Sequence, residues 1–401
     1  MIKHASIVPL IGGETIAQSN VFGSNPDYLL SYEAFGNNDQ HCKNRFNVPY
    51  LLLDKGETHP HYVDVVNTVC PCAGLSSLSP SANSDAAAND WMTTTAEYVL
   101  GKMQPKVFWG ENAPRLASKM GVPVVEKLDA IGKKHGYSLS IYKTKSILHG
   151  LSQVRDRTFY FFWKGDRIPV LKNYVREWEK IEDAIRSVPY DVNDKMAQLT
   201  NTRKPTSDPY YRYILEVIHG GITHKEFSSM ITHTAEVLTY IEEQGHDYKQ
   251  VGAWMSANGY EKEVEKCNRR YDKLKAGFNI MRKLTTVPKD YIGAFVGHLP
   301  MQLTHPDEDR YLTIREAMEI MKLPRDFELL GGLRNLNHIC QNVPVTTAMD
   351  MATEVKAWLN GERDSIPADN CVYVQHNGGQ PAVMKKLIGA EEKSSLEGFF
   401  S

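Results

Sequence analysis

Short apolar runs alternate with helical stretches over residues 1 to about 163, and this alternation is what most restricts the fold. Strands that alternate with helices build a parallel sheet with helices on its faces, so the sequence predicts an α/β fold. Several runs stop at Gly, Asn or Pro, where a strand gives way to a loop. Chemistry in such sheets gathers at the carboxyl ends of the strands. The runs are 7–11, 50–53, 63–69, 106–109, 138–142 and 158–163.

The pattern changes after this region. From about 164 the segments become long, amphipathic and rich in charge, as in 173–186, 211–219 and 228–244, which predicts a separate, mostly helical domain. Helical patterns return at 313–321 and 345–359. The predicted divisions are 1–163 and 306–365 for the two parts of one domain, 164–305 for the helical domain, and 366–401 for a tail of unassigned role.

Composition excludes several classes of protein. The 46 Lys and Arg against 48 Asp and Glu give a net charge of -2, which excludes a uniformly basic nucleic-acid coat but allows a local basic patch. Six scattered cysteines are too few for a disulfide scaffold, and no cysteine-histidine cluster supports a metal site. There is no signal-peptide core and no apolar run of about 18 residues, so we expect a cytoplasmic protein that neither enters nor crosses a membrane. We also expect the protein to act as a monomer.

Three strand ends carry polar groups suited to catalysis. An apolar strand breaks at Pro71 and presents a cysteine, Cys72, close to a second one, Cys70. A lone cysteine at a strand end is more often structural than catalytic, so this element needs support from others. A second apolar strand ends in Glu111 followed by Asn112. These two elements predict a nucleophile and a carboxylate at the same sheet edge.

The third element is a glycine turn followed by a strand that places Gln153, Arg155 and Arg157 on alternate positions, and therefore on one face. Arginines are planar donors of several hydrogen bonds and suit carboxylates, carbonyls and phosphates. Taken alone, these two arginines would be interpreted as a surface ion pair with Asp156.

In this order the elements resemble the 5-methylcytosine DNA methyltransferases. The blocks of that family are a glycine-rich loop, Pro-Cys, Glu-Asn-Val, Gln-x-Arg-x-Arg, a variable target-recognition region, Arg-x-Leu-Thr-x-x-Glu and Gly-Asn-x-x-Pro. The last two correspond here to 309–316 and 340–345. The resemblance covers roughly residues 5 to 360. It implies a Rossmann-like S-adenosylmethionine-dependent methyltransferase domain with a smaller, mostly helical target-recognition domain that acts on double-stranded DNA.

The resemblance also implies a mechanism. The Cys72 thiolate would add to carbon 6 of a cytosine flipped out of the duplex, so that carbon 5 can accept a methyl group. Glu111 would hold or protonate ring nitrogen 3, which requires a raised pKa. Arg155 and Arg157 would bind the cytosine carbonyl, the Glu111 carboxylate or a phosphate, and Gln153 would contact DNA. The polar stretch 76–89 would be a lid, or else a plain linker.

The cofactor loop departs from the family pattern Phe-x-Gly-x-Gly-Gly. It aligns with 8–13, where the aromatic residue and the first glycine are missing. Gly12 and Gly13 still allow a tight turn from strand to helix and a close approach of a ligand. Glu33 stands where the family places an acid on the ribose hydroxyls of S-adenosylmethionine. Asn342 corresponds to the position that returns beside this loop.

A local basic patch lies between residues 266 and 289, with eight basic residues and one acid. Asp247 is predicted to cap a helix through about Met255, and a second helix is predicted over 261–275, which together resemble a helix-turn-helix. The second helix would bury Val264, Tyr271 and Leu274. Its basic face would either lie along DNA or be a solvated surface. The candidate DNA-binding residues on that face are Lys266, Arg269, Arg270 and Lys273.

Two alternatives remain open at this stage. One is a related enzyme that transfers another group to cytosine from a modified S-adenosyl cofactor, because the cofactor loop departs from the pattern. The other is a catalytically silent DNA-binding protein on the same fold, although the intact Cys72, Glu111 and paired arginines argue against it. A prokaryotic or phage-infected cell is the expected setting.

Overall fold

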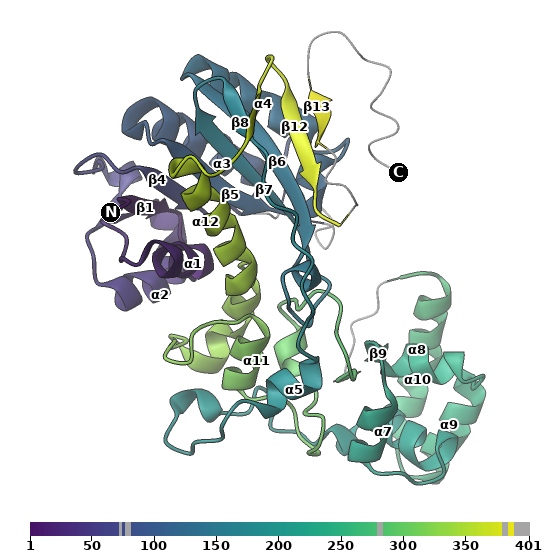
Figure 1. Ribbon diagram of the computed structural model, residues 1–401. Coiled ribbons are helices and arrows are strands. Elements are labelled where there is room, and N and C mark those ends of the chain that lie inside the picture. Colours follow the sequence, from purple (N-terminus) through teal and green to yellow (C-terminus); the bar gives the residue numbers. More distant parts are fainter. Residues whose placement is uncertain (72–73, 77–81, 279–283, 379–383, 389–401) are drawn as a thin grey trace. The chain divides into compact units, whose positions relative to one another are not determined.

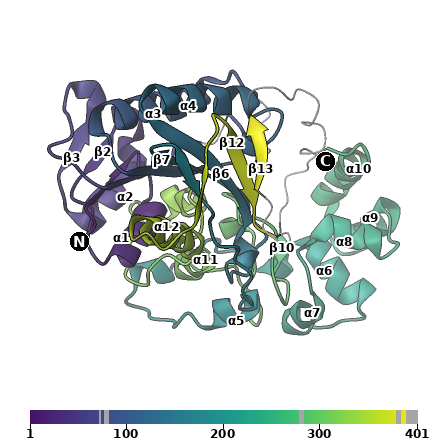
Figure 2. The same ribbon diagram turned by 45° about the horizontal axis from the view of Figure 1, so that its top comes forward.

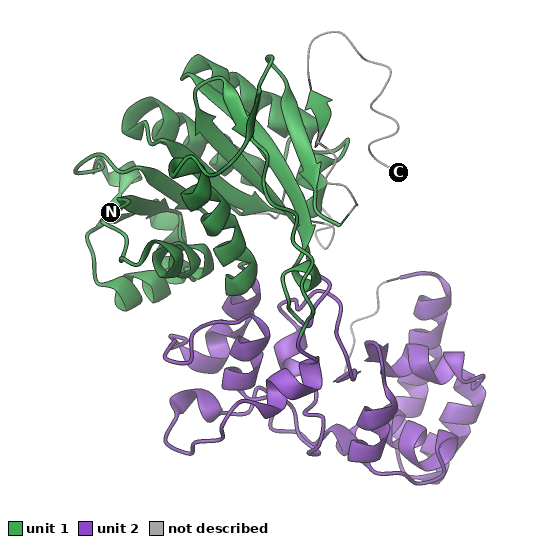
Figure 3. Cartoon of the chain, in the orientation of Figure 1, with its two compact units in different colours: residues 1–151, 155–178, 341–401 green, residues 152–154, 179–340 purple. Residues whose placement is uncertain are grey.

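The computed structural model describes residues 1–71, 74–76, 82–278, 284–378 and 384–388, and the chain forms two compact units (Figure 1, Figure 3). Unit 1 comprises residues 1–151, 155–178 and 341–401, and unit 2 comprises 152–154 and 179–340. No helix among the described residues combines the length and apolar character needed to cross a membrane.

Unit 1 is a layered α/β structure. The strands of its described residues are β1 (His4–Ile7), β2 (Leu29–Ser31), β3 (Tyr50–Leu52), β4 (Val65–Thr68), β5 (Val107–Asn112), β6 (Tyr137–Lys145), β7 (Asp156–Lys164), β8 (Arg167–Pro169), β11 (Ser365–Pro367), β12 (Val372–His376) and β13 (Met384–Ile388). Its helices are α1 (Gly13–Phe22), α2 (Gly36–Phe46), α3 (Asp90–Tyr98), α4 (Val122–Lys134) and α12 (Val345–Leu359).

The described strands form a nine-stranded sheet in the order β13-β12-β6-β7-β5-β4-β1-β2-β3, and β8 pairs separately with β11. Helices α3 and α4 cover one face, and α1 and α12 cover the other (Figure 2). Both faces are therefore buried, which explains why the strands are continuous apolar runs. Strand order reverses between β1 and β4, and ligands of such sheets bind outside the carboxyl ends at a reversal of this kind. The predicted α/β fold is confirmed.

The sheet is mixed, whereas the sequence pattern indicated a parallel one. Strand β7 runs antiparallel to both of its neighbours, β5 and β6, and β13 runs antiparallel to β12. Residues 146–155 connect β6 to β7 without a crossover helix, and a parallel pair would need such a crossover. Directly opposite residues of β5 and β7 stack in the core, as Trp109 does on Phe161, with ring centroids 6.1 Å apart.

Unit 2 is mostly helical. Its described elements are α5 (Ile181–Arg186), α6 (Pro209–Tyr213), α7 (His224–Met230), β9 (Ala235–Glu236), α8 (Val237–Glu243), α9 (Tyr248–Ala257), α10 (Glu261–Lys275), β10 (Thr285–Thr286) and α11 (Ile314–Ile320). Helices α9 and α10 match the predicted helix pair, and Asp247 caps α9 through the N–H groups of Lys249 and Gln250. A core rich in tyrosine, with Tyr210, Tyr211 and Tyr271 buried, holds these helices together.

The two compact units divide the chain at other residues than the predicted divisions at 164, 305 and 366. Unit 2 extends to residue 340, and residues 164–178 belong to unit 1. Of the helical pattern at 173–186, only Ile181–Arg186 is helix. The segment before it is part of unit 1 and uses its backbone groups for contacts there: the Tyr174 N–H donates to the Asn377 side chain (2.9 Å). The supposed tail supplies β11, β12 and β13, which are too short to show periodicity.

A buried ion pair attaches α12 to the end of β6. The Asp350 carboxylate accepts hydrogen bonds from His149 Nδ1 and Arg176 Nη2, both at 2.7 Å, and His149 Nε2 lies 2.7 Å from the Thr144 hydroxyl. The side chains of His149 and Asp350 are 0% and 6% exposed, so water cannot replace a lost partner.

Asp350→Ala is therefore expected to lower the free energy of unfolding by about 3 kcal/mol, because it leaves a buried imidazole without its acceptor. Urea unfolding followed by circular dichroism measures this change. The control is Asp156→Ala, where a half-exposed carboxylate lies 3.9 Å from Lys145; its effect should stay within about 0.5 kcal/mol. Equal effects of the two variants would contradict a clamping role for Asp350.

Candidate active site

The loop between β1 and α1 is strained. Val8 and Leu10 adopt left-handed conformations, with φ of 51° and 50°. Residues other than glycine rarely adopt these angles, and a β-branched residue least of all. The loop is held by hydrogen bonds: the Val8 N–H donates to the Leu30 carbonyl (2.9 Å), and the Leu10 N–H donates to Asp39 Oδ1 (2.8 Å). Strain of this kind persists where the surroundings enforce it, often at ligand sites.

The two glycines of the loop are required by close packing. A side chain on Gly12, whose φ is 91°, would place its Cβ 3.1 Å from the sulfur of Cys42. A Cβ on Gly13 would lie 3.1 Å from the Cβ of Asn342. Asn342 thus lies against the start of α1, which is the arrangement that the sequence predicted for it.

A buried acid follows these glycines. Glu14, in the first turn of α1, is 0% exposed, and its Oε2 accepts a hydrogen bond from Asn342 Nδ2 at 2.5 Å. Burial raises the pKa of Glu14 well above its ordinary value, and the negative charge of Glu111 raises it further. The start of α1 therefore holds a carboxyl group that ionises reluctantly.

The carboxyl ends of β4 and β5 lie side by side, because these strands pair in parallel with Thr68 opposite Gly110. The Pro71-Cys72 dipeptide follows β4, and Glu111 and Asn112 end β5. Glu111 is 2% exposed, and Asn112 is fully buried and accepts the Ala113 N–H through Oδ1 (2.8 Å). The strand ends that lead to these two predicted elements therefore lie at one edge of the sheet.

Both predicted arginines approach this edge. Arg157 Nε lies 3.1 Å from Glu111 Oε2 in an ion pair, and Arg155 Nη2 donates to the Asn342 carbonyl at 3.1 Å. Burial raises the pKa of Glu111, while Arg157 and then Arg155 oppose the rise. The sequence analysis placed both arginines on one strand face, but β7 begins at Asp156, so Arg155 precedes the strand.

The two cysteines of this region differ. Cys72 lies outside the described residues, as do residues 77–81 of the predicted lid. Cys70 is buried, with its sulfur 3.4 Å from the Thr68 hydroxyl and 3.7 Å from the Trp91 carbonyl. Burial raises the pKa of the Cys70 thiol, which disfavours the thiolate that a nucleophile requires.

Two predicted site residues have other partners. Glu33 is exposed, and its carboxylate lies 2.5 Å from Lys55 Nζ. Gln153 is fully buried in unit 2, where its Nε2 donates to the Ile320 carbonyl (2.9 Å) and its Oε1 accepts the Phe295 N–H (3.3 Å). The described conformation thus commits both ends of the Gln153 amide to the protein backbone and leaves none for DNA.

The basic residues of α10 fall into two groups. Arg269 and Lys273 are exposed. Lys266 and Arg270 both pair with Glu263, at 3.1 and 3.0 Å, and Arg270 also donates to the Tyr210 hydroxyl at 3.1 Å. On the opposite side of the helix Tyr271 and Cys267 are buried, while Val264 and Leu274, also predicted to be buried, are only partly covered.

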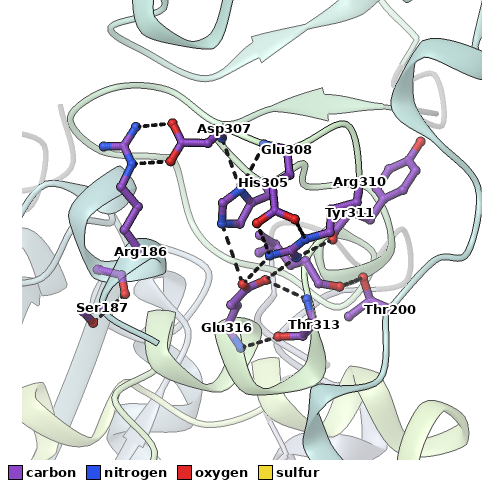
Figure 4. Close-up of polar contacts among 12 residues, drawn as sticks. Arg186, Ser187, Thr200, His305, Asp307, Glu308, Arg310, Tyr311, Thr313 and Glu316 are labelled. Carbon is purple, nitrogen blue, oxygen red and sulfur yellow. Dashed lines mark hydrogen bonds and ion pairs between the residues drawn. The ribbon is translucent and has the colours of Figure 1, made fainter. Parts of the chain in front are cut away.

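The Arg-x-Leu-Thr-x-x-Glu block has a structural role within unit 2 (Figure 4). Thr313 and Glu316 form a capping box at the start of α11, and Arg310 binds both oxygens of Glu316 at 2.9 and 3.0 Å. His305 lies beside them: its Nδ1 accepts the N–H groups of Asp307 and Glu308 (3.1 and 3.2 Å), and its Nε2 lies 3.8 Å from Glu316. Bidentate pairing of this kind fixes the chain where it enters α11.

Two residues of the unit 1 site were missed by the sequence analysis. Glu14 was not among the predicted site residues, although an acid directly after Gly12 and Gly13 was its available signal. Asp39 gave no signal, because it stands in a polar stretch; burial raises its pKa to about 7 while it holds the loop through Leu10.

The fold of the chain is that of methyltransferases. A protein described as a DNA modification methyltransferase encoded within an E. coli prophage superposes with a TM-score of 0.57 at 14% identity, over 90% of this chain and 100% of that one. The Entamoeba histolytica methyltransferase EhMeth superposes with a TM-score of 0.51 at 12% identity, over 90% of this chain and 99% of that one. No curated protein matches the sequence significantly.

The sequence matches the C-5 cytosine-specific DNA methylases over residues 49–357. The chain therefore belongs to the C-5 cytosine-specific DNA methylase family, and it is a DNA (cytosine-5) methyltransferase that uses a methyl donor.

Proposed function

We propose that the protein methylates carbon 5 of a flipped-out cytosine in double-stranded DNA through a covalent bond to Cys72, with S-adenosylmethionine as the donor. The observation that carries this proposal is the buried ion pair of Glu111 and Arg157 at the carboxyl end of β5, next to the end of β4 that leads to Cys72. Carbon 6 of a stacked base is inaccessible, so the cytosine must leave the duplex.

Cys72 and Glu111 act in successive steps of the proposed reaction. The Cys72 thiolate forms a bond to carbon 6, and the ring electrons move to carbon 5, which forms the new bond to the methyl group as the bond from that methyl group to the sulfur of the donor breaks. Glu111 gives a proton to nitrogen 3 as negative charge develops there. A base then removes the proton from carbon 5, the Cys72 sulfur leaves as the double bond between carbons 5 and 6 returns, and the proton on nitrogen 3 goes back to Glu111.

The start of α1 suits S-adenosylmethionine, which supplies an electrophilic methyl group when bound. Glu14 Oε1 and Asn342 Oδ1 are buried and have no hydrogen-bond partner among the described residues. They lie beside a strained loop at the point where strand order reverses, which is where such sheets bind nucleotides. Gly12, Gly13 and Asn342 would hold the donor. Glu33 would need to leave Lys55 to reach its ribose.

Sequencing of DNA from a host that expresses the protein and has no cytosine methylation of its own tests the activity. We expect 5-methylcytosine in one sequence context. A different modification on cytosine would favour a modified cofactor instead. Unmodified DNA, with the protein present and folded, would contradict the proposed function.

Helix α10 of unit 2 is proposed to contact DNA through its basic face. Arg269 and Lys273 stand four residues apart, so they share a side of the helix, and both are exposed. Lys266 and Arg270 belong to the same face, but their pairing with Glu263 gives them a structural role as well.

Arg269→Ala with Lys273→Ala is expected to weaken duplex binding and to reduce the slope of log affinity against log salt by about 1.8, because each phosphate contact contributes about 0.9. Binding to fluorescent duplexes over a salt series measures both quantities. The control is Lys102→Ala with Lys127→Ala, two exposed lysines of unit 1. If the two double variants behave alike, α10 is a solvated surface.

A further inference from the structure

Glu14 is an enclosed acid that the proposed mechanism does not use. It lies in the first turn of the ten-residue helix α1 and is 0% exposed. One carboxylate oxygen accepts from Asn342, while the other, Oε1, has no hydrogen bond of normal geometry among the described residues; the backbone N–H groups of Glu14 and Val343 stabilise the carboxylate less than Asn342 does. Buried acceptors are nearly always paired, so an open one indicates that a partner is missing.

The open oxygen is not isolated. Asn342 Oδ1 is also buried without a partner among the described residues, and Asn342 lies directly against Gly13. The carbonyl of Asn342 is held by Arg155, which fixes the residue in place. Two acceptors therefore lie at the start of α1, beside the strained loop after β1.

The charges around these acceptors determine which ligand fits. Glu14 faces the negative charge of Glu111. A helix start ordinarily attracts anions, but the carboxyl group of Glu14 there, together with the negative charge of Glu111 at the end of β5, opposes a phosphate or carboxylate. A cation, or a cationic group that carries N–H donors, satisfies the open oxygens and offsets the repulsion between the carboxylates.

We propose that Glu14 binds the cationic methionine end of the methyl donor, through its ammonium or sulfonium group, and so positions the donor in the absence of the usual aromatic and first glycine of the loop. This inference rests on S-adenosylmethionine being the donor. A purely structural Glu14 would serve only to accept from Asn342. A glutamine would accept that bond equally well, which separates the two roles.

The test compares Glu14→Gln with the parent protein by calorimetry, using three ligands that differ in charge. S-adenosylmethionine carries both cationic groups, S-adenosylhomocysteine only the ammonium, and 5′-methylthioadenosine neither. We expect Glu14→Gln to lose about 10- to 100-fold in affinity for S-adenosylmethionine and to bind 5′-methylthioadenosine unchanged. An equal loss for S-adenosylhomocysteine would identify the ammonium as the contact, and no loss would identify the sulfonium.

The matched control is Glu354→Gln, which also removes a fully buried carboxylate of unit 1, but one paired with Arg363 (2.7 Å). Thermal unfolding verifies that both variants fold. Unchanged affinity of Glu14→Gln for S-adenosylmethionine, or an equal loss for all three ligands, would overturn the inference. If the parent protein bound none of the three ligands, the proposed donor itself would be wrong. If the parent bound S-adenosylmethionine and Glu14→Gln bound it equally well, only the role of Glu14 would be wrong.

Discussion

Cys72→Ser is expected to abolish methyl transfer, with a loss of roughly 10⁴-fold or more, while Cys70→Ser keeps most of the activity. A serine alkoxide is not available near neutral pH, whereas a cysteine thiolate is. Cys70 is a poor nucleophile because its sulfur is buried against Thr68 and Trp91, and burial raises its pKa. Initial rates of methyl incorporation into duplex DNA measure both variants.

Trapping identifies the nucleophile directly. A duplex that contains 5-fluorocytosine should form an adduct with the parent protein that survives denaturation, because fluorine at carbon 5 blocks the final elimination. Cys70→Ser should form the same adduct, and Cys72→Ser should form none. An adduct that persists in Cys72→Ser and is lost in Cys70→Ser would transfer the role to Cys70.

The central strands could be predicted from the sequence because both of their faces are buried. Strands β4, β5 and β7 are continuous apolar runs, and their predicted positions were correct to within a few residues. The run at 7–11 was wrong as a strand, since β1 ends at Ile7 and the chain turns into left-handed angles. Those angles depend on hydrogen bonds to Leu30 and Asp39, which no local pattern records.

The meeting of Glu111 and Arg157 was expected from the family resemblance and not from the strand pattern. It depends on β7 running antiparallel to β5, and the sequence had indicated a parallel sheet. The contact between Glu14 and Asn342 joins residues 328 positions apart in the chain, so only the folded unit reveals it. Likewise, Gln153 was expected to contact DNA, but the packing of unit 2 buries it against Ile320 and Phe295.

Glu111→Gln is expected to lower kcat by about 10²- to 10⁴-fold and to change how the rate depends on pH. The acid must hold a proton in order to give it to nitrogen 3. Burial raises the pKa of Glu111, so the protonated form is populated at a higher pH than for an exposed carboxyl group. As the pH rises through that raised pKa the proton is lost, so the rate should fall.

The parent enzyme should therefore show a descending limb as the pH rises through the pKa of Glu111, and Glu111→Gln should lose this limb, because an amide does not titrate in this range. The variant should still fold. Ionisation of Glu111 lowers the free energy of unfolding as the pH rises through its raised pKa, whereas a glutamine stays neutral and has no such effect. Glu126→Gln, an exposed position on α4, is the matched control and should keep the descending limb and the parent rate. If Glu111→Gln kept a kcat within about threefold of the parent and kept the descending limb, the proton on nitrogen 3 would have to come from another group.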